Sequence, residues 1–163
     1  MSPRGGAVRE GRAAGPARRV VDVSAEGVRP AVSRDRVRAV AERVLRAEGV
    51  RHALLSIAFV TDRRIAQLNR EHLDHTGPTD VISFGFAPIG AGGAVVGDVY
   101  IAPAVAARNA AEHGGGVREE LLRLVVHGVL HVLGHDHPDG DARYASPMWR
   151  RQERMVRAAL GSR

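Results

Sequence analysis

HGVLHVLGHDH, residues 127–137, is the stretch of the 163-residue chain that decides its fold. Within it, His127 and His131 are four residues apart on a predicted helix over residues 117–133. Four residues turn an α-helix by about 400°, so the two imidazoles share one face, with Cβ atoms about 6 Å apart. Both rings can therefore reach a single metal ion.

Gly134 gives the chain a way to bring a third histidine to the same place. A glycine there can take the left-handed conformation that ends a helix, after which the chain turns back. His137 follows the turn, and we expect its ring to join His127 and His131 around one zinc ion. Three neutral histidines leave a fourth tetrahedral position for water, whose pKa zinc lowers to about 7. The sequence therefore predicts a catalytic zinc centre on a central helix, without identifying a general base.

Two other residues of the motif are candidates for supporting roles. His135 and Asp136 are close in sequence to the three histidines and carry side chains that can bind a metal. Asp136 could instead orient one of the histidine ligands from outside the coordination sphere. A fourth protein ligand would close the site, and zinc would then only stabilise the fold.

The same ligand spacing occurs in metzincin peptidases, whose motif is HExxHxxGxxH. Their glutamate acts as the general base, and this chain has Gly128 in its place. A peptidase would need another group to deprotonate water and to protonate the leaving amine. Phosphodiester cleavage depends less on that glutamate, because the metal itself can polarise a phosphoryl oxygen. The pattern favours a phosphodiester substrate, with a metzincin-like peptidase as the alternative.

Composition narrows the chemistry further. The chain has no cysteine, which excludes disulfides, thiolate zinc sites and thiol nucleophiles. Residues 1–20 contribute +4 of the net charge of +6, because five arginines there face one glutamate. The charge is therefore weak evidence for a basic surface on the folded part. No apolar run approaches the roughly 18 residues of a transmembrane helix, so we expect no membrane span.

The order of predicted helices and strands indicates one α+β domain, a small mixed sheet covered by helices. Residues 1–17 are rich in Gly, Ala, Pro and Arg and predict a disordered basic tail, which leaves 18–163 as the folded domain. Strands are predicted at 19–23, 54–60, 81–86 and 98–102, the last two as antiparallel partners. Helices are predicted from 34 to a stop at Gly49, in a short segment after residue 61, and at 103–112, 117–133 and 147–160.

Three motifs in this order resemble the YbeY family of bacterial endoribonucleases and rRNA maturation factors. They are PTDVISF at residues 78–84 preceded by Leu68–Asn69, then GDVYIAP at residues 97–103, and then HGVLHVLGHDH. With the C-terminal helix, the resemblance covers residues 18–160. It implies a zincin-like fold and a metal-dependent hydrolase with one zinc ion on His127, His131 and His137.

The resemblance also implies a biological role. The expected activity is a single-strand-specific endoribonuclease in the cytoplasm that matures the 3′ end of 16S rRNA and takes part in ribosome quality control. The expected partners are single-stranded RNA and the small ribosomal subunit. A non-catalytic ribosome-assembly factor with a structural zinc is a further alternative.

This chain departs from the family pattern at two neighbouring positions. Where many members carry an aromatic residue three places after the asparagine of the second motif, this chain has His72. Many members carry an arginine four places after the asparagine of the second motif, where the resemblance implies a contact with RNA, and this chain has Leu73. Arg70 lies nearby and is the candidate replacement, with a solvated helix-end charge as the plainer reading. Asp80, just before the strand predicted at 81–86, is a candidate for contacting substrate or supporting the metal, with a structural turn as the alternative.

Overall fold

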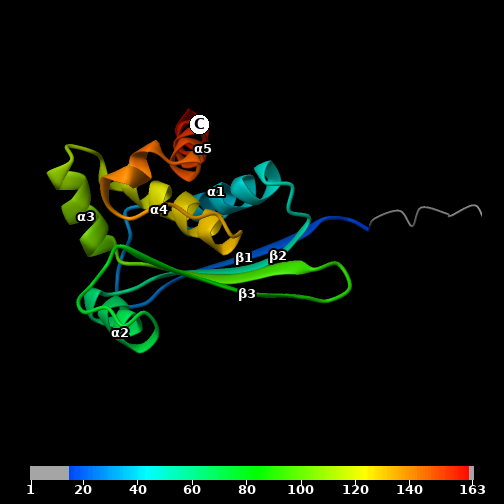
Figure 1. The fold of residues 1–163 in the computed structure, drawn as a ribbon, viewed down its shortest axis with the longest axis horizontal. Coiled ribbons are helices and arrows are strands. Elements are labelled where there is room, and N and C mark those ends of the chain that lie inside the picture. The colour runs from blue at the N-terminus through cyan, green and yellow to red at the C-terminus, as the bar shows by residue number, and fades with distance from the viewer. Residues whose placement is uncertain (1–14, 162–163) are drawn as a thin grey trace, which may run out of the picture.

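Four strands rich in β-branched and aliphatic residues form one mixed sheet in the computed structural model, which describes residues 15–161 (Figure 1). The strands are β1 (Arg18–Ala25), β2 (His52–Phe59), β3 (Val81–Ile89) and β4 (Ala94–Ile101). The helices are α1 (Arg34–Ala47), α2 (Asp62–His72), α3 (Pro103–Glu112), α4 (Val117–Val132) and α5 (Pro147–Gly161), with a 3₁₀ helix η1 (Gly140–Ala145) before α5. Most of the tail predicted at 1–17 falls outside the described residues.

The sheet has the strand order β1-β2-β4-β3. β1, β2 and β4 run parallel, while β3 is an edge strand antiparallel to β4, its partner across a glycine-rich turn. Val23 pairs with Ile57, and Ile57 with Val99, which aligns three buried side chains across the sheet. The predicted α+β class, the mixed sheet and the antiparallel pairing are therefore confirmed.

α4 is the central helix of the domain. Helices α1, α4 and α5 lie on one face of the sheet and α2 lies on the other (Figure 1). α4 contacts α1, α3 and α5 as well as β3 and β4, so a helix that is apolar almost all round is covered on every side. Its buried side chains are Leu121, Leu122, Leu124, Val125, Val126, Val129 and Leu130. Of the described helices, none is long and apolar enough to cross a membrane.

Local sequence signals set the ends of the first two helices. The Ser33 side chain accepts a hydrogen bond from the Arg36 N–H at 3.2 Å and caps α1. Gly49 follows the C-terminus of α1 with a φ of 71°, a left-handed conformation that glycine adopts without steric cost. Thr61 caps α2 in the same way, since its hydroxyl accepts from the Arg64 N–H.

Two glycines allow α4 to lie very close to the sheet. A Cβ at Gly128 of α4 would come within 2.5 Å of a Val99 methyl carbon, and a Cβ at Gly97 of β4 within 2.3 Å of a Val132 methyl carbon. Real Cβ atoms do not tolerate such distances, so any side chain at either position would force α4 and β4 apart. This contact fixes the distance between the sheet and the histidine-bearing helix.

The structure differs from the predicted elements mainly around β3 and β4. β4 begins at Ala94, four residues before the predicted start, because residues 95–97 already pair with β2. β3 runs on to Ile89 past an irregularity in register after Phe86. Asp98 consequently lies within a strand and not at a strand start. The 3₁₀ helix η1 was not predicted.

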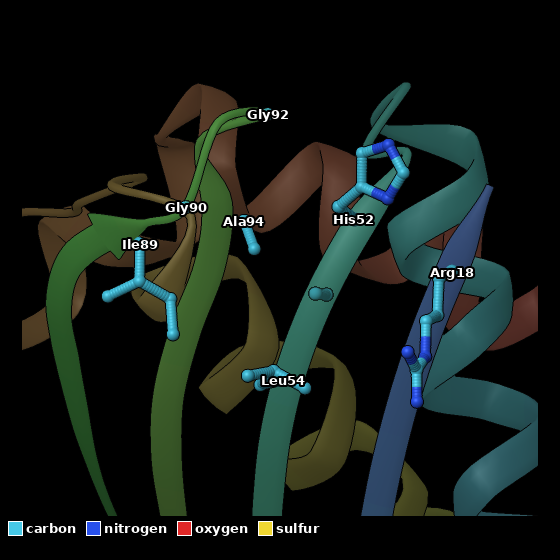
Figure 2. Close-up of a pocket in the computed structure, with 8 residues that line it drawn as sticks. Arg18, His52, Leu54, Ile89, Gly90, Gly92 and Ala94 are labelled. Atoms are coloured by element: carbon cyan, nitrogen blue, oxygen red, sulfur yellow. The ribbon is translucent and has the colours of Figure 1, made fainter. Parts of the chain in front are cut away.

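α2 covers only part of its face of the sheet, and the uncovered part is partly apolar. α2 covers one end through a second small core that includes Ile65, Leu68 and Ile82. Elsewhere on this face, Arg18, His52, Ala94 and Ile89 stand side by side in the register and line a shallow pocket of about 530 Å³ (Figure 2). This pocket is on the face turned away from α4, so it takes no part in the histidine cluster.

Candidate metal centre

The three histidines of the motif come together as the sequence predicts. His127 and His131, one turn apart on α4, have ring centroids 4.6 Å apart. After α4, Gly134 takes a φ of 91°, and the His135 N–H donates to the Leu130 carbonyl while the Gly134 N–H donates to the His131 carbonyl. These two bonds form a Schellman turn, which reverses the chain. The His137 ring then lies 5.1 Å from that of His127 and 5.0 Å from that of His131.

The spacing of the ring nitrogens suits a small cation. One ring nitrogen from each histidine lies within 4.8 Å of the other two. Ligand nitrogens at 2.0–2.1 Å from a tetrahedral zinc are about 3.4 Å apart, so the cluster is close to the grouping that zinc requires. All three side chains are half-buried, which leaves one side of the cluster open to solvent.

Hydrogen bonds fix the tautomers of two of the rings. The His127 Nδ1 lies 2.8 Å from the Gln152 Oε1, and the His137 Nδ1 lies 2.9 Å from the Pro138 carbonyl oxygen. Both partners are acceptors, so each Nδ1 must carry the proton and donate. Each Nε2 therefore keeps its lone pair, the form in which histidine binds metals.

Burial favours the neutral form of His127 and His131. It lowers the pKa of His127 to about 4, against the opposing effect of the Gln152 hydrogen bond. Burial also lowers the pKa of His131, and the neighbouring His137 lowers it further. At neutral pH the lone pairs of His127 and His131 are thus available without prior loss of a proton. The donor set, its spacing and its protonation all fit a metal ion of the zinc type.

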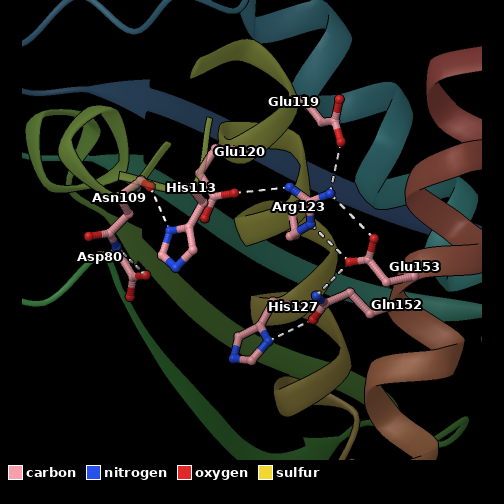
Figure 3. Close-up of polar contacts among 9 residues, drawn as sticks. All are labelled: Asp80, Asn109, His113, Glu119, Glu120, Arg123, His127, Gln152 and Glu153. Carbon is pink, nitrogen blue, oxygen red and sulfur yellow. Dashed lines mark hydrogen bonds and ion pairs between the residues drawn. The ribbon is translucent and has the colours of Figure 1, made fainter. Parts of the chain in front are cut away.

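A buried polar chain supports His127 from behind (Figure 3). Gln152 of α5 is only 1% exposed, and its amide Nε2 donates to the Glu153 Oε1 at 3.2 Å, which sets the orientation in which Oε1 faces His127. Glu153 in turn accepts from the Arg123 Nε at 2.9 Å. Arg123 also binds Glu119 and Glu120 on its own helix. The position of the His127 ring therefore depends on the packing of α5 against α4.

The two remaining candidates of the motif point elsewhere. The His135 Nε2 lies 2.7 Å from a carboxylate oxygen of Glu48, so His135 binds the end of α1 instead of joining the cluster. The other oxygen of Glu48 accepts from Arg151, which links the end of α1 to α5. Asp136 accepts from the backbone N–H of His137 at 2.8 Å. It thus stabilises the turn that carries His137, while no bond to a histidine ring is formed by this carboxylate.

Comparison with known proteins decides the family. A family model described as endoribonuclease YbeY matches residues 23–159, most of the chain and all of the histidine motif. The chain belongs to the endoribonuclease YbeY family. The resemblance inferred from the three sequence motifs is confirmed.

Curated YbeY relatives come from diverse bacteria. The endoribonuclease YbeY of Aquifex aeolicus is 38% identical over 67% of this chain and 73% of its own length. That of Anaeromyxobacter dehalogenans is 48% identical over 66% of this chain, and the match spans 56% of its length. That of Pelotomaculum thermopropionicum is 40% identical over 74% of this chain and 81% of its length.

The fold also matches a solved structure. The solution structure of TM1509 from Thermotoga maritima aligns with a TM-score of 0.60 and 26% identity, over 87% of this chain and 90% of that one. The agreement extends over most of both chains. The zincin-like arrangement expected from the YbeY resemblance is therefore present.

Leu73 stands where many YbeY proteins carry an arginine, and it lies away from the histidines. Leu73 ends α2, on the opposite face of the sheet from α4, and is exposed. Arg70 is also exposed on α2, and neither Arg70 nor Leu73 lines the groove that contains His127. Asp80, in contrast, lines a groove together with His127, and its Oδ2 accepts from the Asn109 amide at 3.1 Å. Of these candidates, Asp80 alone lies in the groove beside the cluster.

The groove beside His127 contains residues that the sequence analysis missed. It encloses about 800 Å³ between α3, α4 and the η1–α5 corner. Besides His127 and Asp80, its lining includes Asn109, His113, Arg123, Arg143, Tyr144, Trp149 and Gln152. The segment RYASPMW, residues 143–149, was a signal in the sequence, because it concentrates two aromatic side chains and a cation in a chain that has few aromatics.

Replacing Gly134 with alanine is expected to destabilise the protein by about 1–2 kcal/mol, the usual cost of a left-handed conformation for a residue with a Cβ. No side chain lies within 4 Å of the added carbon, so the loss is conformational and not steric. Urea unfolding of the metal-free protein measures it. Gly161→Ala, at a position with an ordinary φ and open space, is the control and should lose nothing.

Proposed function

We propose that this chain is a metal-dependent endoribonuclease that cleaves single-stranded RNA, with His127, His131 and His137 holding one zinc ion. The observation that carries the proposal is the convergence of three imidazoles in a chain of the YbeY family. The curated relatives are named endoribonucleases, and RNA is their implied substrate. The folded domain proposed for this activity is 18–163.

The chemistry divides between the metal and the protein. A bound zinc ion supplies a Lewis acid that stabilises negative charge on a phosphoryl group and makes water more acidic. Gln152 and Pro138 hold the His127 and His137 rings in the tautomer that presents Nε2. The packing around α4 excludes water from behind the site, which strengthens electrostatic interactions with a phosphate in front of it.

Two observations favour this function over the alternatives. Gly128 is buried against Val99 and Ser83, so the position of the metzincin base has no room for a glutamate and faces the sheet. Within residues 15–161, the cluster that could hold a metal contains the three histidines and no fourth His, Cys or carboxylate. A set of three ligands is typical of catalytic zinc, whereas structural zinc takes four.

We also propose the biological setting implied by the family. The expected RNA is the 3′ region of 16S rRNA, and the expected partner is the small ribosomal subunit in the cytoplasm. Accumulation of unprocessed 16S precursor in a deletion strain, reversed by the wild-type gene and not by a His131→Ala copy, would support this role. Normal processing in the deletion strain would refute it.

The activity itself is tested with purified protein and defined RNA. Zinc-loaded protein should cleave a single-stranded RNA, leave the same sequence in a duplex intact, and lose activity with a chelator. Added zinc should restore the activity, because the three-histidine site has no other way to activate the reaction. Cleavage that survives complete removal of metal would contradict the proposal. Zinc-dependent hydrolysis of a peptide instead of RNA would favour the peptidase alternative.

Replacing Gln152 with leucine should weaken zinc binding by roughly 10- to 100-fold, the usual cost of losing a hydrogen bond that orients a ligand histidine. Gln152→Glu keeps an acceptor for the His127 Nδ1–H and should retain most of the affinity. A competition titration with a coloured chelator measures both variants. Gln67→Leu on α2 is the matched control, because the Gln67 amide contacts only Glu71 at the surface. Equal affinity of the leucine variant and the wild type would remove Gln152 from the site.

A further inference from the structure

We propose that the groove beside His127 binds one unpaired nucleotide of the RNA, with its base stacked on Tyr144 and its phosphate held by Arg143. The inference rests on the proposed RNase function and extends it by naming the residues that select single-stranded substrate. Arg143, Tyr144 and Trp149 line the same groove as His127, so a strand passing the metal centre enters it directly.

The groove has the size and the surface that a nucleotide needs. Its volume of about 800 Å³ exceeds that of one nucleotide and remains open to solvent. Tyr144 is 48% exposed, and its ring stands at 90° to that of Trp149, with centroids 4.7 Å apart. Because nearly half of Tyr144 is exposed, part of its ring remains accessible to a base, beside the Arg143 guanidinium that lies over it. Bases stack readily on such rings, whatever their identity.

The aromatic pair is held in a fixed position. The Ser146 hydroxyl accepts a hydrogen bond from the backbone N–H of Trp149 at 3.1 Å and donates one to the Arg143 carbonyl, which fixes the corner between η1 and α5. Trp149 is half-buried and supports Tyr144 from one side. A preorganised platform of this kind binds a base without first paying the entropy of ordering side chains.

Charge in the groove favours a phosphate near Arg143. Two acidic side chains of the wall, Glu119 and Glu120, are engaged by Arg123. Arg143 donates its Nε to the Gly140 carbonyl and lies 5.7 Å from the centre of the Tyr144 ring, and no carboxylate among residues 15–161 pairs with it. Arg143 lines the same groove as His127. The cation is thus near the metal centre and available to a substrate phosphate.

The arrangement explains a preference for single strands. A base can reach the Tyr144 face only when it is unpaired and unstacked, since bases in an A-form duplex are enclosed by their neighbours. A duplex could still touch Arg143 through its phosphates but could not fill the groove. Strand selectivity would then come from this groove and not from the metal.

Trp149 is the chain's only tryptophan, so its fluorescence reports on this groove alone. We expect its emission to change when zinc-loaded protein binds a short 2′-O-methylated single-stranded RNA, and to stay constant with the matching duplex. Tyr144→Ala should weaken binding roughly tenfold, within the range for one base stacked on an aromatic ring. Tyr144→Phe keeps the ring and should bind almost as the wild type does.

Arg143 is tested through salt dependence. Arg143→Ala should weaken binding and lower the slope of log Kd against log salt by about one, as expected for one lost phosphate contact. Arg143→Lys should keep the slope, and Arg63→Ala, at an exposed position of α2, is the control. Anisotropy of a dye on the RNA measures binding independently of Trp149.

Three outcomes would overturn the proposal. Constant Trp149 emission while anisotropy reports binding would place the RNA elsewhere, as would unchanged affinity in Tyr144→Ala. In both cases the proposed function stands if the wild type still cleaves unmodified RNA. Absence of both binding and cleavage would overturn the groove and the proposed function together.

Discussion

Replacing His131 with alanine is expected to abolish stoichiometric zinc binding and to reduce RNA cleavage by roughly a hundredfold or more. Loss of a hydrogen bond outside the coordination sphere already costs about 10- to 100-fold, and loss of a ligand removes more. His131 shares the cluster with His127 and His137 and makes the shortest approach between ring centroids. Metal content by mass spectrometry and initial cleavage rates measure the two effects on one preparation.

The control for His131 is a histidine on the far side of the sheet. His52→Ala removes an imidazole from the pocket on the open face, outside the cluster, and should keep both zinc and activity. Folding is checked by circular dichroism and urea unfolding of the metal-free proteins. A His131→Ala protein that is folded, binds zinc as the wild type does and cleaves RNA at the same rate would refute the assigned site.

Introducing the metzincin glutamate by Gly128→Glu is expected to unfold the protein, or to destabilise it by roughly 4 kcal/mol or more, instead of creating a peptidase. The added side chain would start 2.5 Å from a Val99 methyl carbon and 3.1 Å from the Ser83 Oγ, in the contact between α4 and the sheet. A buried carboxylate there would lack a partner for its charge. Thermal and urea unfolding measure the loss.

Gly128→Ala separates the steric effect from the charge. Alanine normally stabilises a helix by about 1 kcal/mol over glycine, whereas overpacking a rigid core costs about 1–3 kcal/mol. Val99 is fully buried and has no room to move, so the steric cost should prevail. Combining it with Val99→Ala should recover part of the loss, and a double-mutant cycle measures the coupling. A stabilised Gly128→Ala protein would show that α4 is not held this close to β4.

Much of the fold was predictable because its signals are local. Ser33 and Gly49 mark the ends of α1, and Gly134 takes the left-handed conformation that its place after a helix indicates. The grouping of His127 with His131 follows from helical periodicity alone. The return of His137 follows from the turn at Gly134, whose hydrogen bonds lie within six residues of sequence.

The parts that were not predictable depend on contacts between distant segments. Gln152 meets His127 only because α5 packs on α4, and the pattern of α5 does not reveal which partner a buried glutamine will find. His135 turns to Glu48, which is 87 residues earlier in the chain. The early start of β4 likewise depends on pairing with β2, because Ala94 and Gly97 flank Val95 and Val96 with residues of low strand propensity.

The groove beside His127 was predictable only in part. Its aromatic residues stand out in the sequence, but their relation to His127 requires the corner between η1 and α5, and η1 has no clear sequence signal. From the sequence, Gly128 is explained only as the residue that replaces the general-base glutamate of metzincin peptidases. The structure adds a second reason for glycine, the close contact with Val99.

X-ray absorption at the zinc edge of the purified protein tests the central claim most directly. We predict three imidazole nitrogens at about 2.0–2.1 Å and one further light atom from solvent, and the loss of this pattern in His131→Ala. A spectrum with four protein ligands, or with fewer than three imidazoles, would contradict a three-histidine centre with one position open to substrate.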